Sequence, residues 1–117
     1  MRGCVGRPRY GDVMTAEAVI EEIRVRLAAA VPPRSRVLLF GSRARGDADD
    51  GSDFDVLVIE PEVESPIAES VRLRRELRGL GVPIDVVVIE ARAGRRAAVR
   101  GTMVQRALDE GRVLVDA

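Results

Sequence analysis

Apolar residues recur at helical spacing in two segments of the first eighty residues. The first segment runs from Thr15 to Ala30, carries acidic residues early and arginines late, as the helix dipole favours, and ends at Val31-Pro32-Pro33. The second begins at Ser65, an N-cap residue followed by proline at the first helical position, and ends at Gly79 and Gly81. The apolar stripe of this second helix is formed by Ile67, Val71, Leu73, Leu77 and Leu80.

Short runs rich in Val, Ile and Leu predict the strands, and one more helix is expected over residues 97–108, capped by Gly111. The expected element order is α-β-β-α-β-α-β. This order predicts an α/β fold, or an α+β fold if the sheet is mostly antiparallel, with helices covering a small sheet of about three to four strands. The expected strands lie at residues 37–40, 53–60, 83–89 and 112–115.

Length and composition predict one folded domain. The chain has 117 residues, of which 46% are hydrophobic and 32% charged, so disorder over its length is not expected. Residues 1–14 hold three glycines and a proline without periodicity and are predicted to be a flexible lead-in to a domain over residues 15–117. Because no stretch approaches the ~20 apolar residues of a membrane span, the protein is expected to be cytoplasmic.

Charge and residue usage exclude several kinds of chemistry. The formal net charge is zero, which argues against a general nucleic-acid binder. All 19 positive charges are arginines, and with neither lysine nor histidine the chain cannot use an imidazole base or a lysine Schiff base. The single cysteine, Cys4, excludes both an internal disulfide and a cysteine-ligated metal site.

An Asp-x-Asp pair inside an apolar strand is the strongest candidate for a functional site. Asp53 and Asp55 project from the same face of their strand, about 6.5 Å apart along the backbone. Asp85 has a similar early position in the next strand, and joins them if the strands are neighbours. Carboxylates ~5 Å apart repel by about 3 kcal/mol at an effective dielectric near 20, so such a cluster favours a bound cation. All-oxygen ligation selects Mg²⁺ or Mn²⁺.

A Gly-Ser turn precedes this pair. Gly41 allows close approach of the backbone to a phosphate, and Ser42 can donate its hydroxyl. The amides that follow form an anion-binding nest if they open a helical turn. Two hard ions can bind the attacking and leaving oxygens of an in-line phosphoryl displacement, and such a turn can bind the phosphates of the substrate.

Other interpretations of the loop were compared with this one. A P-loop requires Lys and then Ser or Thr after Gly46, where Asp47 and Ala48 stand. An EF-hand loop starting at Asp47 fails because Gly51 and Ser52 occupy its fifth and sixth positions. A solvated acidic turn is the better interpretation of Asp47, Asp49 and Asp50, and both interpretations stay open for Asp85.

These residues resemble a known family. The motif consists of Gly41-Ser42, ten further residues, and then Asp53-Phe54-Asp55. It is set within the segments Leu-Phe-Gly-Ser-Arg-Ala-Arg-Gly and Ser-Asp-Phe-Asp-Val-Leu-Val. This motif resembles the minimal nucleotidyltransferases of the DNA polymerase β superfamily, and in particular the antitoxin member of HEPN/MNT toxin–antitoxin pairs. The resemblance is specific between Val37 and Ile59 and extends to Asp85 and to residues 109–114.

The resemblance implies a nucleotidyltransferase fold with a small mixed sheet, and it implies roles for the site residues. Asp53 and Asp55 would bind a pair of Mg²⁺ ions, and Asp85 would be the third carboxylate, shared with the ion that activates the acceptor hydroxyl. Gly41 and Ser42 would hold the β- and γ-phosphates. ATP would be the substrate, and AMP would pass to a tyrosine of a partner HEPN ribonuclease, which silences that toxin.

The roles of several arginines and the identity of the acceptor each have more than one interpretation. Arg43 and Arg45 either neutralise the triphosphate or are solvated. Two arginine groups are either solvated helix faces or a docking surface for an acidic partner. The alternative functions are a non-catalytic antitoxin that acts by binding, and an enzyme that modifies a small molecule such as an aminoglycoside. No acceptor-binding domain is recognised in the sequence, so a partner protein is expected to complete the site. The two groups are Arg72, Arg74, Arg75 and Arg78, and Arg95, Arg96 and Arg100.

Overall fold

The structure, a computed structural model, describes residues 15–45, 53–92 and 109–116. Several expectations therefore lie outside the described residues: the lead-in over residues 1–14, the helix over 97–108, and the second arginine group. So do the loop aspartates Asp47, Asp49 and Asp50.

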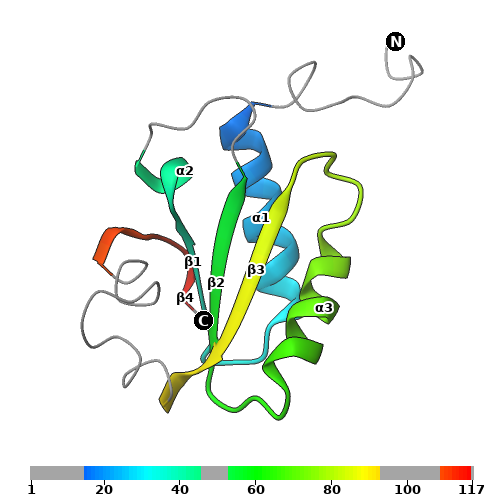
Figure 1. The fold of residues 1–117 in the computed structure, drawn as a ribbon, viewed down its shortest axis with the longest axis vertical. Coiled ribbons are helices and arrows are strands. Elements are labelled where there is room, and N and C mark those ends of the chain that lie inside the picture. The colour runs from blue at the N-terminus through cyan, green and yellow to red at the C-terminus, as the bar shows by residue number, and fades with distance from the viewer. Residues whose placement is uncertain (1–14, 46–52, 93–108, 117) are drawn as a thin grey trace.

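The described strands form one mixed sheet. Its order is β3-β2-β1-β4, with β2 parallel to β3, and with β1 antiparallel to both β2 and β4 (Figure 1). The predicted strands are confirmed to within one residue at each end, and the predicted α/β-type class with a small mixed sheet is confirmed. The strands are β1 Arg36–Phe40, β2 Phe54–Glu60, β3 Ile84–Glu90 and β4 Arg112–Asp116.

Two helices, α1 (Ala16–Ala30) and α3 (Pro66–Glu76), cover one face of the sheet (Figure 1). The Ser65 hydroxyl accepts a hydrogen bond from the Ala68 amide at 3.3 Å, as predicted for an N-cap. The Thr15 hydroxyl caps α1 in the same way, at 3.1 Å from the Ala18 amide, which was not predicted from the sequence. A short helix, α2 (Ser42–Arg45), follows β1 directly. Within the described part of the chain, every helix is too short or too polar to cross a membrane.

The core lies between these helices and the sheet. Phe54, Val56 and Val58 of β2 are fully buried there, together with Ile23 of α1 and Leu73 of α3. On the opposite face Leu57 is buried among partly exposed apolar residues of the three strands β1, β2 and β3. Because side chains alternate along a strand, this second face is the one that also carries Asp55 and Asp85.

The predicted apolar stripe of α3 is partly wrong. Leu73, Leu77 and Leu80 are buried as expected, but Ile67 is 78% exposed and Val71 is 40% exposed. At 100° per residue, Ile67 and Val71 lie roughly 120–160° around the helix from Leu73, so they cannot reach the sheet on the same side.

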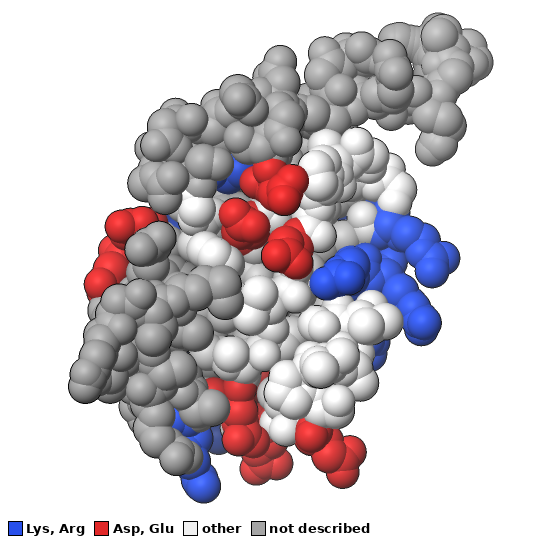
Figure 2. Space-filling model, viewed as in Figure 1, with Lys and Arg blue, Asp and Glu red and all other residues white. Residues whose placement is uncertain are grey.

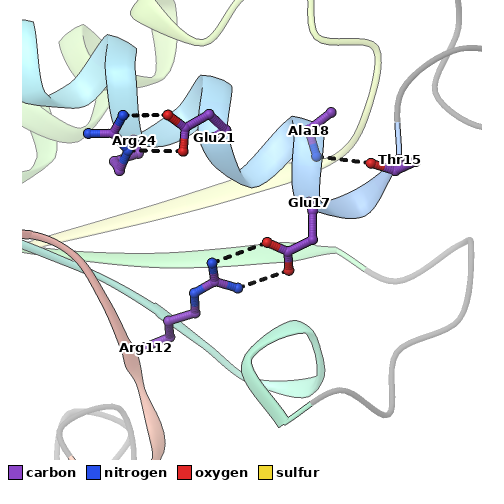
Figure 3. Close-up of polar contacts among 6 residues, drawn as sticks. All are labelled: Thr15, Glu17, Ala18, Glu21, Arg24 and Arg112. Carbon is purple, nitrogen blue, oxygen red and sulfur yellow. Dashed lines mark hydrogen bonds and ion pairs between the residues drawn. The ribbon is translucent and has the colours of Figure 1, made fainter.

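Ion pairs fix α1 to its surroundings. Glu17 in its first turn receives two hydrogen bonds from the Arg112 guanidinium of β4, at 2.9 and 3.1 Å, and these lower the pKa of Glu17 (Figure 3). Glu21 and Arg24 pair along the same helix (Figure 3). The guanidinium of Arg26 donates to the Arg78 carbonyl at 2.8 Å, so α1 also caps the C-terminal end of α3.

A buried carboxyl at the end of β2 was not foreseen from the sequence. Glu60 is only 2% exposed, and burial, together with a hydrogen bond to Glu69 and its charge, raises the pKa of Glu60 to about 7. Hydrogen bonds from Arg72 lower the pKa of Glu69 to about 2. Arg72 also donates to the Ala30 carbonyl at 2.9 Å. Below about pH 7, Glu60 is therefore mainly a neutral acid that donates a hydrogen bond to Glu69. Arg72, although about half exposed, links the end of α1 to the first turn of α3 through the Ala30 carbonyl and Glu69.

Glu60 should make stability depend on pH. Its pKa rises from 4.5 in the unfolded chain to about 7 in the folded one, so its stabilising contribution is complete below about pH 4.5 and is lost as the pH rises through 7. The lost contribution is on the order of 2–3 kcal/mol. We expect Glu60→Gln, which resembles the neutral acid, to remove this dependence, as measured by urea unfolding between about pH 5 and pH 8. Glu62→Gln, at an exposed neighbour, is the control; an unchanged pH dependence in Glu60→Gln would contradict the assignment.

Candidate active site

The topology brings the predicted site residues to one edge of the sheet. The C-terminal end of β1 and the N-terminal ends of the parallel strands β2 and β3 meet there (Figure 1). Gly41 follows β1, and Asp53 directly precedes β2. In the register of β2 and β3, Asp55 lies opposite Asp85, with a strand spacing of about 4.8 Å. The structure therefore places Asp85 on the same face and at the same level as Asp55.

Electrostatic repulsion accompanies this arrangement. The pKa of Asp55 is raised, first by burial and then by the charges of Asp53 and Asp85. Asp53 and Asp85 are exposed, whereas Asp55 is half-buried between them. Figure 2 shows acidic side chains gathered on this face near the beginning of β2 and β3. A divalent cation would relieve the repulsion that these carboxylates impose on one another.

The glycine of the Gly-Ser turn has a structural role that sequence reasoning missed. Gly41 has a φ of +78°, a region that favours glycine, and a Cβ at this position would lie 2.6 Å from Oδ2 of Asp55. The Asp55 carboxylate thus packs directly against the backbone of Gly41. Glycine is required here for the conformation of the turn and for the space that Asp55 occupies.

The turn after Gly41 is helical, which is the condition for an anion-binding nest. The Ala44 amide donates to the Gly41 carbonyl at 3.1 Å as α2 begins. The backbones of Ser42 and Arg45 lie in α2, but their side chains fall outside what the structure describes. Their predicted roles at the phosphates stay predictions.

Arg43 packs against the protein itself. Its guanidinium carbon lies 4.2 Å from the centre of the Phe54 ring, a cation–π contact of the kind worth about 0.5–2 kcal/mol. Since Phe54 is the first residue of β2, the contact holds α2 against the strand that carries Asp55. Contact with a nucleotide stays a prediction for Arg43.

Asp85 has a cationic neighbour that the sequence did not reveal. A guanidinium nitrogen of Arg74, on α3, lies 3.8 Å from Oδ1 of Asp85. Both side chains are more than half exposed, so the pair is solvated. No sequence signal links these residues, because their proximity depends on α3 packing beside β3.

The carboxylates fit a metal that arrives with its substrate. Among the residues that the structure describes, no three His, Cys, Asp or Glu side chains form a ready ligand set for an ion. Mg²⁺ usually binds through one or two carboxylates and completes its shell with water and substrate phosphates. Asp53 and Asp55 supply hard oxygen donors of this kind, and Asp85 lies beside them.

Replacing Gly41 tests its contact with Asp55. We expect Gly41→Ala to lower the free energy of unfolding by more than the roughly 1–2 kcal/mol of backbone strain, because the new Cβ must also displace the Asp55 carboxylate. Gly79→Ala is the matched control, since Gly79 has a φ of +88° and nothing within 4 Å of the new Cβ. Urea unfolding measures both variants; equal losses would contradict the proposed contact.

Structural comparisons agree with this architecture. The chain is similar to a candidate nucleotidyltransferase from Sulfolobus solfataricus, at 30% identity and a TM-score of 0.52, over 67% of this chain and 69% of that one. It also resembles in fold a toxin–antitoxin structure with AMP-PNP, at 23% identity and a TM-score of 0.59, over 83% and 73% of the two chains. A mutant of the toxin–antitoxin pair MntA–HpeT matches at 18% identity and a TM-score of 0.53, over 89% and 75%.

Sequence comparisons give the family. None of the curated proteins compared with this chain matches it in sequence. The family model described as the nucleotidyltransferase domain, in contrast, matches residues 20–114, which include Gly41, Asp53, Asp55 and Asp85. The chain therefore belongs to the nucleotidyltransferase domain family.

Proposed function

We propose that the protein is a Mg²⁺-dependent nucleotidyltransferase that moves AMP from ATP to a hydroxyl group, namely a tyrosine of a partner HEPN toxin, and so acts as an antitoxin. The observation that carries this proposal is the parallel register of β2 and β3. It sets Asp85 beside Asp55, at the edge where Asp53 and Gly41 also lie.

The residues of the chain would divide the reaction between them. Asp53 and Asp55 would hold the divalent ions, which neutralise charge on the triphosphate and on the leaving pyrophosphate. The backbone after Gly41 would bind the β- and γ-phosphates at the start of α2. Asp85, exposed on the same face, would accept a hydrogen bond from the acceptor hydroxyl and orient its oxygen toward the α-phosphorus.

Two observations support the choice of substrates. A structure with this fold is described as a toxin–antitoxin with AMP-PNP, an adenine nucleotide. This similarity is the reason for proposing ATP as the substrate and a protein as the partner. Asp85 is also exposed rather than enclosed, so a macromolecular acceptor can approach it. The second point favours a protein hydroxyl over a small molecule such as an aminoglycoside, which enzymes usually enclose in a pocket.

A non-catalytic antitoxin is the second candidate function. It is favoured by the Arg74 guanidinium beside Asp85, and by the lack of a ready three-ligand metal set among the described side chains. Such a protein would neutralise its toxin by binding alone, with the carboxylates taking no part.

Label transfer separates the two candidates. The protein would be incubated with ATP labelled at the α-phosphate, Mg²⁺ and the product of the adjacent gene. Asp53→Asn/Asp55→Asn should reduce transfer roughly a thousandfold, because several kcal/mol of metal stabilisation is lost at 1.36 kcal/mol per decade. Glu62→Gln/Glu64→Gln, which removes two exposed carboxylates beyond the opposite end of β2, should transfer label normally.

The toxin assay completes this experiment. Catalysis would be overturned, and the non-catalytic antitoxin supported, by two results together. Asp53→Asn/Asp55→Asn would neutralise the toxin fully, and neither the wild-type protein nor this variant would transfer label to the toxin.

A further inference from the structure

A groove lies next to the carboxylate edge, between the C-terminal end of α3 and the beginning of β3. It has a volume of about 380 Å³. Leu77, Pro83 and Ile84 are among the apolar residues that line it, and Arg74 and Arg78 line it from α3 and the turn that follows. The groove thus combines apolar walls with cationic side chains.

Its cations are largely uncompensated. Arg74 and Arg78, which line the groove, are exposed, as is Arg75, the next residue of α3. Figure 2 shows basic side chains gathered beside the acidic group of the sheet edge. Within the described part of the chain, the one ion pair of these three arginines is the 3.8 Å contact of Arg74 with Asp85. Arg72 does not contribute, because Glu69 and the Ala30 carbonyl hold its guanidinium. The excess charge at the groove is therefore positive.

The groove is built on a fixed backbone. Arg26 of α1 donates to the carbonyls of Arg78 at 2.8 Å and of Glu76 at 3.4 Å, which ties down the end of α3. Gly79 and Gly81 both have positive φ, at 88° and 75°, and turn the chain sharply toward β3. A surface that is already ordered loses little entropy when a ligand binds.

The groove also leads to the candidate site. Ile84 lines it, and the next residue is Asp85, whose side chain alternates to the face that carries Asp55. Arg74 spans both places, since it lines the groove and lies 3.8 Å from Asp85. A segment bound in the groove would place its neighbouring residues at Asp85.

We infer that this groove docks the acceptor segment of the partner protein: a polypeptide segment with carboxylates on the side of the acceptor hydroxyl that lies in the groove. Its acidic side chains would pair with Arg74 and Arg78 in the groove and be attracted by the neighbouring exposed Arg75, and an apolar side chain would lie against Leu77 and Ile84. The inference rests on the proposed function, and it deepens that function by assigning the determinants of acceptor choice to α3 and its turn.

Charge and lining select this occupant over others. Single-stranded nucleic acid binds where aromatic side chains stack on its bases, and the residues lining the groove include none. The N-terminal lead-in of the chain carries Arg2, Arg7 and Arg9 against the single acid Asp12, so its charge does not complement the groove. An acidic polypeptide satisfies both the arginines and the apolar walls.

Fluorescence anisotropy tests the groove without any chemical step. The probe is a fluorescein-labelled peptide in which glutamates and a leucine lie on one side of a single tyrosine, compared with the same peptide carrying lysine for glutamate. We expect the glutamate peptide to bind, and to bind more weakly as salt rises. Arg75→Ala/Arg78→Ala should weaken its binding roughly tenfold. The matched control Arg24→Ala/Arg92→Ala, which removes two arginines elsewhere, should not change it.

Different results would overturn the docking groove and the proposed function. Equal binding of the two peptides, equal binding by the two double variants, or binding of a single-stranded RNA oligonucleotide in place of the glutamate peptide would each overturn the inference. ATP affinity, measured in parallel by calorimetry, should be the same in both double variants. If the wild-type protein transfers no label but binds the glutamate peptide through Arg75 and Arg78, the proposed function fails while the docking groove stands.

Discussion

The position of the Asp55 carboxylate is the constraint on which the candidate site depends. On one side it packs against the backbone of Gly41, where even a Cβ would come within 2.6 Å of its oxygen. On the other side the register of β2 and β3 sets Asp85 directly opposite. The carboxylate is therefore half-buried among like charges, and its raised pKa is the result. A divalent cation would relieve this repulsion and could at the same time bind the oxygens of a nucleotide phosphate, which is why the geometry favours phosphoryl chemistry.

The sheet has acidic residues at both ends, and the least exposed carboxyl group at each end has different surroundings. At the end of β2, Glu60 is mainly neutral below about pH 7 and donates a hydrogen bond to Glu69, and Arg72 pairs with Glu69. Glu90, at the end of β3, accepts a hydrogen bond from the Val63 amide. At the beginning of the same strands, Asp55 has two carboxylate neighbours and the solvated Arg74–Asp85 contact as the nearby ion pair among the described residues. The parallel pairing thus separates Glu60, whose neighbours are Glu69 and Arg72, from Asp55, whose like-charged neighbours favour an external cation.

Local signals predicted most of the fold and half of the candidate site. The cap at Ser65, the strands and the positions of Gly41, Asp53 and Asp55 follow from residue type and spacing alone, because each is set within one turn or one strand. Strand order and the contact of Arg74 with Asp85 join distant segments, and the periodicity of one chain does not encode them. Burial of Glu60 and exposure of Ile67 depend equally on how α3 lies on the sheet.

Paramagnetic broadening by Mn²⁺ shows directly whether the carboxylates at the beginning of β2 and β3 bind a divalent cation together with a nucleotide. In an NMR spectrum of the protein with a non-hydrolysable ATP analogue, the account predicts that substoichiometric Mn²⁺ broadens the amide signals of Gly41, Asp53, Asp55 and Asp85 first. Without the nucleotide the same broadening should need more Mn²⁺, since the carboxylates alone do not complete an ion's shell. Broadening that centres instead on Glu60 to Glu64, at the opposite end of the sheet, would contradict the account.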